Sequence, residues 1–483
     1  MAIALAAAIS MLSGYLLTDA VWPHARGTVS AWLMKLSLAA GLGLGISSCG
    51  FFVTGMAGGD HFVVSDILLL AVIFVLYVLI RVRSGRPIPP NWVTTDFEAP
   101  GWLRLVLASS FVLTIFAALY CSAQRMVAHE HGDGWDAFAI WNLHARFLFL
   151  GGPHWRDGFN ALIPWSHPDY PLLLPAAIAR FWSYLGHDNP AVPSLIGFVF
   201  TLCTVTLLVS SLAQLRGRNA AMLSGIALSA TPFFIEQGAA QYADIPLSFF
   251  ILASIVLLHF GFRSQWRNKL THLYGPWLLA GLSAGFAGWT KNEGLLFLAA
   301  IFLAHLPTFL ARPSSESAPE NPTERKYEIS FVLGVIPVLV VIIWFRHSVA
   351  TAGDLLSSPA IMLEKILTPS RYLAILRWYV KDLLRFGEWW LVPETALLPI
   401  FYLLVRKKRI RYDPLLRSSS AALALTFAGY FVIYLITPRD LYWHLRFSLN
   451  RLFLQLWPAT LFLFFLFVGR QSPAPSQNEP EIP

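Results

Sequence analysis

The feature that most constrains this chain is a succession of apolar runs, each about as long as a bilayer's hydrocarbon core is thick. A helix needs roughly 20 mainly apolar residues to span that core. Such runs lie near 1–21, 30–54, 62–80, 102–121, 191–213, 219–236, 244–262, 273–289, 294–311, 329–347, 390–405, 418–436 and 451–469. They predict an all-α polytopic membrane protein with about 13 transmembrane helices.

Composition supports a membrane protein. Of the 483 residues, 56% are hydrophobic and 13% are charged, whereas soluble domains average about 25% charged residues. The net charge is +8, but the sequence contains no long basic run interleaved with aromatics. The charge therefore indicates membrane topology rather than nucleic-acid binding. The three cysteines are far apart and have no metal-ligand spacing, so we interpret them as packing residues.

Lys and Arg residues set the orientation, because cytoplasmic connections carry most of them. If the basic connections lie in the cytoplasm, successive helices cross the membrane in alternating directions. These connections are 81–86, 216–218, 263–269, 325–326 and 406–411. Residues 122–190 and 348–389 then form two loops on the outer face. The tail 471–483 is rich in Pro, Ser and Glu, and we expect it to be disordered and cytoplasmic.

Residues 122–190 are too long for a simple connection, and long loops are commonly functional. The apolar stretch 170–186 is short and contains prolines and Arg180. We expect it to lie on the outer membrane surface as an amphipathic helix. The stretch 137–150 is interpreted in the same way, with Trp141, Ala145 and Leu148 on one face.

Two carboxylates open this loop, in the stretch Gly132-Asp133-Gly134-Trp135-Asp136. A carboxylate within hydrogen-bond reach of an acceptor hydroxyl or amine can act as its general base. Asp136 and Asp133 are therefore the candidate catalytic residues. The alternative is helix capping, for which Asp is favoured.

A second polar cluster, Ser166 to Pro171, supplies His167, Asp169 and Tyr170 as candidate substrate-binding residues. Their polar groups could contact a sugar or an acceptor. The alternative is that Asp169 or Tyr170 caps the helix that follows Pro171. Two ligands do not make a metal site, so no metal is predicted.

Two further polar groups lie at the expected outer ends of apolar helices. The first contains Gln241, Tyr242 and Asp244, and the second contains Lys291 and Glu293. Ionisable residues at membrane depth suggest function. We interpret Lys291 as a phosphate ligand and Gln241, Asp244 and Glu293 as substrate-binding residues. The alternative is that Lys291 and Glu293 form an exposed pair.

The last external loop is basic, and its candidate phosphate ligands are Arg439, His444, Arg446 and Arg451. Arginine forms forked hydrogen bonds to phosphate oxygens. With aromatic neighbours at a membrane surface, these residues suit a lipid phosphate whose chain lies in the bilayer. The alternative is that the side chains only reach outward to lipid headgroups.

Taken together, these features resemble the GT-C superfamily of integral-membrane glycosyltransferases, and within it the bacterial form of the protein O-mannosyltransferase and aminoarabinose-transferase group. The matching pieces are Asp133 and Asp136, His167 to Pro171, Gln241 to Asp244, Lys291 to Gly294 and the late Arg-rich loop. The resemblance covers roughly residues 102–469. Residues 1–100 are then additional helices, and residues 101–470 form the GT-C module.

The resemblance implies an enzyme that moves a sugar from a polyprenyl-phosphate donor to a lipid, glycan or protein acceptor at the periplasmic face. Asp136 takes the role of the base, although Asp133 could align instead. Inversion at the anomeric carbon is implied, and neither a cofactor nor a metal is required. The alternatives are a transporter or flippase of lipid-linked sugars, which would show broken helices and paired halves, and an oligosaccharide ligase.

Overall fold

The computed structural model describes residues 1–22, 28–59, 61–83, 100–130, 132, 134–268, 274–310, 323–351, 359–388, 394–405 and 414–468. These ranges contain helices and connecting segments, with no β-strand among them. The all-α membrane fold predicted from the sequence is confirmed. Nine helices in the described ranges are long and apolar enough to cross a membrane. They are α1 (Ala2–Val21), α2 (Val29–Met56), α3 (Phe62–Arg83), α4 (Gly101–Ala128), α7 (Ala191–Leu215), α10 (Asp244–Asn268), α13 (Thr323–Ser348), α17 (Pro414–Ile436) and α18 (Leu441–Phe467).

The other four predicted spans are also helical, but they are shorter or broken. The span expected at 219–236 divides into α8 (Arg218–Ser229) and α9 (Pro232–Ala239). Pro232 opens α9, where its missing N–H is tolerated. The remaining three are α11 (Gly275–Thr290), α12 (Asn292–Leu310) and α16 (Glu394–Val405).

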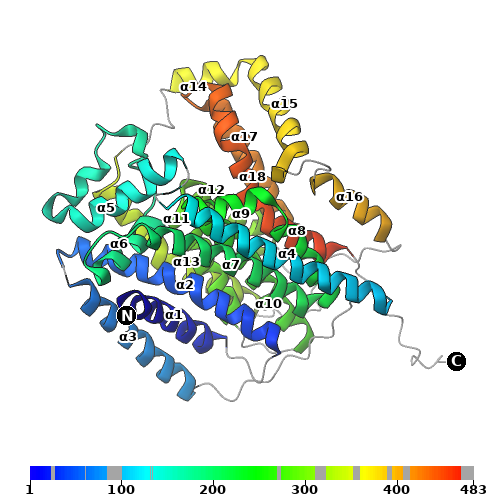
Figure 1. The fold of residues 1–483 in the computed structure, drawn as a ribbon, viewed down its shortest axis with the longest axis horizontal. Coiled ribbons are helices and arrows are strands. Elements are labelled where there is room, and N and C mark those ends of the chain that lie inside the picture. The colour runs from blue at the N-terminus through cyan, green and yellow to red at the C-terminus, as the bar shows by residue number, and fades with distance from the viewer. Residues whose placement is uncertain are drawn as a thin grey trace.

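Helix α10 lies at the centre of the bundle, packed against α7, α11 and α18 (Figure 1). Its apolar stretch is 94% buried, as expected of a helix that is hydrophobic all round. The N-terminal end of α10 is Asp244. This enclosed helix therefore begins with a buried carboxylate.

The N-terminal helices are part of the same body. Helix α2 packs against α7 and against α6 (Leu173–Leu185) (Figure 1). Glycines bring α1 and α2 into backbone contact: a Cβ at Gly14 would lie 2.0 Å from the Ala39 carbonyl oxygen. Small residues are the usual means of such close approach in membranes. Arg180 of α6 also donates to buried Asp66 of α3 at 2.5 Å.

The segment between α4 and α7 folds into short elements: η1 (Ala137–Trp141, a π-helix), α5 (Asn142–Leu150), η2 (Gly152–Phe159), η3 (Pro164–Ser166) and α6. Trp141 and Ala145 are both buried, as the pattern in 137–150 predicts. Helix α6 differs from its predicted surface position. Every residue from Leu173 to Trp182 is buried, because α2 and α5 pack against this helix.

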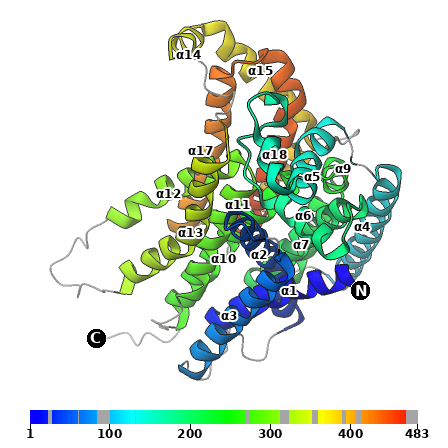
Figure 2. The same ribbon diagram turned by 90° about the vertical axis from the view of Figure 1, so that its left-hand side faces the viewer.

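Two further helices, α14 (Pro359–Ile366) and α15 (Pro369–Arg385), lead through η4 (Phe386–Glu388) toward α16. They lie at one end of the molecule, next to α17 and α18, in both views (Figures 1 and 2). Helix α15 is amphipathic and lines a groove together with α18.

Candidate active site

Two glycines shape the loop that leads into η1. Gly132 has φ +96° and Gly134 has φ +86°, which is the left-handed region that glycine tolerates best. A Cβ at Gly134 would lie 2.8 Å from the Tyr242 hydroxyl oxygen. The loop therefore packs closely on Tyr242 and presents Asp136 at the start of the π-helix. Asp133 lies outside the described residues.

Gln241 fixes this loop through hydrogen bonds. It is buried and has φ +64°, a strained conformation that is often found at functional sites. Its side-chain oxygen accepts a hydrogen bond from Asn142 at 2.8 Å. Its amide nitrogen donates to Ser194 at 2.7 Å and to the Glu130 carbonyl at 3.0 Å. The predicted substrate-binding residue Gln241 thus joins three segments around Asp136.

The core of the site is a chain of ion pairs. Arg451 of α18 contacts Asp136 at 2.6 Å and Asp244 at 2.8 Å. Lys291 contacts the other oxygen of Asp244 at 3.0 Å and Glu293 at 3.0 Å. Three carboxylates therefore share two cations. The structure brings together five predicted site residues from four separate parts of the sequence.

The carboxylates of this cluster differ in exposure. The side chain of Asp136 is 25% exposed, whereas that of Asp244 is fully buried. Gln455 donates a further hydrogen bond to Asp244 at 2.5 Å. Asp244 is thus a fixed counter-ion, and Asp136 is the exchangeable partner of Arg451. Asp136 makes no side-chain capping bond to η1, so the capping alternative is wrong for Asp136.

Lys291 is buried at the junction of α11 and α12. Burial alone would lower its pKa, but the Asp244 and Glu293 carboxylates outweigh burial and raise the pKa above its ordinary value. The ammonium therefore stays charged. The alternative of an exposed Lys291–Glu293 pair is wrong.

The cluster at 167–170 lines the same region. The Tyr170 ring stacks on Trp141 and on His167, with ring centroids 5.6 and 4.6 Å apart. Burial, followed by Glu293, Asp169 and Asp136, raises the Tyr170 pKa well above its ordinary value. The phenol is therefore a stable hydrogen-bond donor.

Asp169 connects this cluster to the segment at Lys291. Its carboxylate accepts a hydrogen bond from Asn292 at 2.6 Å and lies 3.9 Å from Arg346. Arg346 also donates to the Asn292 side-chain oxygen. Helix α6 begins at Leu173 with no side-chain cap, so Asp169 and Tyr170 do not act as its caps.

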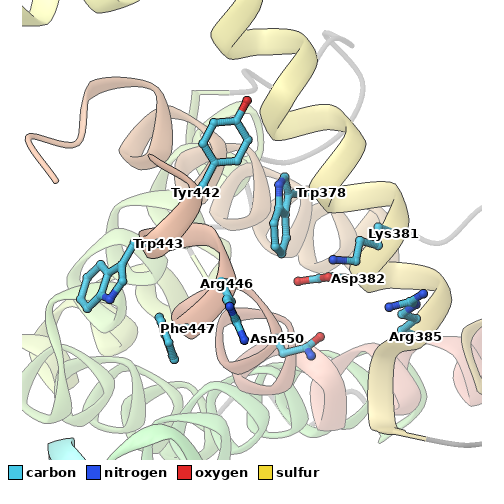
Figure 3. Close-up of a pocket in the computed structure, with 9 residues that line it drawn as sticks. All are labelled: Trp378, Lys381, Asp382, Arg385, Tyr442, Trp443, Arg446, Phe447 and Asn450. Atoms are coloured by element: carbon cyan, nitrogen blue, oxygen red, sulfur yellow. The ribbon is translucent and has the colours of Figure 1, made fainter. Parts of the chain in front are cut away.

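The predicted phosphate ligands of the late loop lie in three places. Arg451 belongs to the ion-pair chain. Arg439 lies 3.3 Å from the His167 ring nitrogen, and His444 lies 2.9 Å from the Thr437 hydroxyl. Arg446 instead lines the groove between α15 and α18 (Figure 3).

Three residues of the site did not emerge from the sequence: Asn142, Arg346 and Gln455. Gln455 carried a usable signal, because a polar residue inside an apolar span is commonly functional. In the described ranges, no three His, Cys, Asp or Glu side chains are grouped as metal ligands.

A family comparison bears on this arrangement. Residues 166–344 match the family model for dolichyl-phosphate-mannose-protein mannosyltransferase. The matched segment contains His167, Asp169, Asp244, Lys291 and Glu293. The match confirms the resemblance found in the sequence and indicates a membrane glycosyltransferase of the mannosyltransferase-like kind. No curated protein and no solved structure matches the chain.

Proposed function

We propose that the protein transfers a sugar from a polyprenyl-phosphate donor to a hydroxyl or amine acceptor on the extracytoplasmic face of the membrane. The acceptor atom forms a bond to the anomeric carbon, and the bond from that carbon to the phosphate oxygen breaks. Asp136 takes the acceptor proton, and polyprenyl phosphate leaves with the bonding electrons. Attack opposite the leaving phosphate inverts the anomeric carbon.

The observation that carries this proposal is the chain from Asp136 through Arg451, Asp244 and Lys291 to Glu293. It places an accessible carboxylate next to two cations that have buried counter-ions. A carboxylate can accept the proton, and fixed cations stabilise the charge that develops on the leaving phosphate. No acid is needed for a leaving group of this kind.

The arrangement also suggests how Asp136 becomes available. Arg451 shares its guanidinium between Asp136 and Asp244. A donor phosphate would compete for the more exposed contact and displace Asp136. Donor binding would thereby free the base at the moment when it is needed, while Asp244 keeps Arg451 in place.

Position along α18 supports an extracytoplasmic site. Arg216 donates to the carbonyl of Val468, just beyond the C-terminal end of α18. At 1.5 Å per residue, Arg451 and Val468 are roughly 25 Å apart along the axis, close to the roughly 30 Å of a bilayer core. The ion-pair chain thus lies in the N-terminal half of α18, and the basic connection at 216–218 lies roughly a bilayer core's thickness away, beyond its C-terminal end.

The test is a transfer assay with the purified full-length protein, a radiolabelled polyprenyl-phosphate hexose and membrane extracts as the acceptor source. Release of polyprenyl phosphate together with labelled acceptor is the expected result. Movement of intact donor across a vesicle membrane without release would instead identify a flippase. Activity only with a diphosphate-linked oligosaccharide would identify a ligase.

A further inference from the structure

A groove with a volume of about 640 Å³ lies between α15 and α18 (Figure 3). Helix α15 contributes Trp378, Lys381, Asp382 and Arg385, and α18 contributes Tyr442, Trp443, Arg446, Phe447 and Asn450. In the close-up, Asp382 and Arg446 point into the space between the two helices. The groove is a site distinct from the ion-pair chain, although Asn450 directly precedes Arg451.

The cations of this groove differ from those of the ion-pair chain in their partners, and the Lys381 ammonium lies 3.9 Å from the centroid of the Trp378 ring. Among the described residues, no ion pair engages Lys381, Arg385 or Arg446. In the ion-pair chain, by contrast, Arg451 and Lys291 each contact two carboxylates. The side-chain oxygen of Asn450 is also buried without a partner. Three cations oppose one carboxylate, Asp382, among the described residues that line the groove.

The surface around the groove has the composition of a segment that lies at lipid headgroups. The exposed side of α15 carries a row of apolar side chains, including Leu373, Leu376 and Val380, as in helices that lie in a membrane interface. Tyr442 and Trp443 are half-exposed at the groove, and such aromatics favour the same depth. A phosphate held here would have its lipid chain directed into the bilayer.

We propose that this groove binds the phosphate of the spent carrier lipid, a polyprenyl phosphate monoester. The assignment rests on the proposed function, because sugar transfer is what releases this product. A phosphate monoester carries between about −1.5 and −2 charges near pH 7, whereas the sugar-linked diester carries one negative charge. An excess of two cationic groups over the carboxylate therefore matches the product better than the donor. The groove would receive the carrier after transfer, on the other side of α18 from Arg451.

The test measures equilibrium binding of radiolabelled farnesyl phosphate to the full-length protein in phosphatidylcholine nanodiscs. The double variant Lys381→Ala/Arg446→Ala should bind about 10- to 100-fold more weakly, because it loses charge-assisted hydrogen bonds to the phosphate. The matched control is Arg377→Ala, an exposed arginine on α15 that does not line the groove; it should bind as wild type does. Asp382→Asn should bind more tightly, because it removes the opposing carboxylate. The tighter binding of farnesyl phosphate by Asp382→Asn tests the proposal even if the double variant does not fold.

Equal binding by wild type and the double variant, or no gain in Asp382→Asn, would overturn the assignment. Competition by phosphatidylglycerol as effective as that by unlabelled farnesyl phosphate would also overturn it and identify a general headgroup contact. Equal competition by inorganic phosphate would identify an aqueous anion site instead. If no polyprenyl-phosphate hexose is turned over but farnesyl phosphate still binds through Lys381 and Arg446, the proposed function fails and the groove remains a lipid-phosphate site.

Discussion

At the residue scale, the proposed chemistry depends on which carboxylate can leave its cation. Asp136 and Asp244 hold the same guanidinium, but only Asp136 is partly exposed. Asp244 is fully buried and also pairs with buried Lys291. Removing one partner of a buried ion pair is strongly destabilising, so Asp244 stabilises the site. Asp136 can exchange its partner for solvent or substrate.

We expect Asp136→Asn to reduce turnover by roughly 10²–10⁴-fold, the usual effect of losing a general base. Donor binding should survive, because the ion pair with Asp244 still holds Arg451 in place. The measurement is sugar transfer at saturating donor, with Asp157→Asn as the control, since Asp157 is an exposed carboxylate of the same segment. Near-normal turnover in Asp136→Asn with loss in Asp133→Asn would move the role of base to Asp133.

His144 provides a second prediction, for stability. Its ring is fully buried against Phe159. Burial, followed by the neighbouring His167, lowers the His144 pKa to about 3, against an opposing effect of the Gly158 backbone. Below the unfolded-state pKa of about 6.5 the unfolded chain takes up a proton that the folded chain does not. Stability is therefore full above that pH and is lost as the pH falls toward 3.

His144→Phe should remove this pH dependence, which amounts to about 2 to 3 kcal/mol at about pH 4.5. The measurement is the thermal unfolding midpoint in detergent at neutral and acid pH. His154→Phe is the control, because His154 is 82% exposed and should leave the dependence unchanged. An identical acid shift in wild type and His144→Phe would contradict the assignment.

At the element scale, the loop before the π-helix η1 decides where Asp136 lies. Glycine is required there for two separate reasons: Gly134 has a positive φ, and it packs against Tyr242. The Tyr242 ring in turn lies under Arg451, with the guanidinium carbon 4.5 Å from the ring centroid. A change at Gly134 is thus transmitted to the cation that holds Asp136.

Gly134→Ala should lower transfer activity well below that of a variant with a similar loss of stability. The left-handed backbone costs roughly 1 kcal/mol or more, and the added Cβ must also displace the Tyr242 hydroxyl. Gly186→Ala is the matched control, since Gly186 has φ +78° and no atom within 4 Å of its added Cβ. Both variants should lose similar stability in thermal unfolding. Equal activity in the two variants would show that the Tyr242 contact does not position the site.

At the scale of the whole molecule, α18 connects the ion-pair chain to the basic connection at 216–218. The ion-pair chain lies in its N-terminal half, and Arg216 contacts the backbone beyond its C-terminus. If basic connections are cytoplasmic, the site is external. Asp157, in the segment between α4 and α7, should then be external too.

Single cysteines in a background without Cys49, Cys121 and Cys203 test this orientation. Asp157→Cys should react with an impermeant thiol reagent added to whole cells, because Asp157 is 65% exposed. Arg218→Cys, exposed at the start of α8, should react only after the membrane is permeabilised. The opposite pattern would place the site in the cytoplasm and contradict the proposed donor side.

Much of the site was predictable residue by residue. Asp244, Lys291 and Glu293 were candidates from the sequence, because charged residues at the ends of apolar runs are expensive unless they are used or paired. Asp136 was a candidate as a general base, and Arg451 was a candidate as a phosphate ligand. Their pairing was not predictable. Asp136 and Arg451 are 315 positions apart, and no local pattern specifies a contact of that kind.

The sequence by itself determined the long apolar helices, because a chain in a bilayer must satisfy its backbone groups within each segment. Only the tertiary structure decided which helix ends meet and which faces they present. Helix α6 became a buried helix because α2 and α5 pack against it. Arg446 and Arg451 separated because five residues at 3.6 per turn place side chains on different faces of one helix. One arginine therefore faces the carboxylates, while the other faces α15.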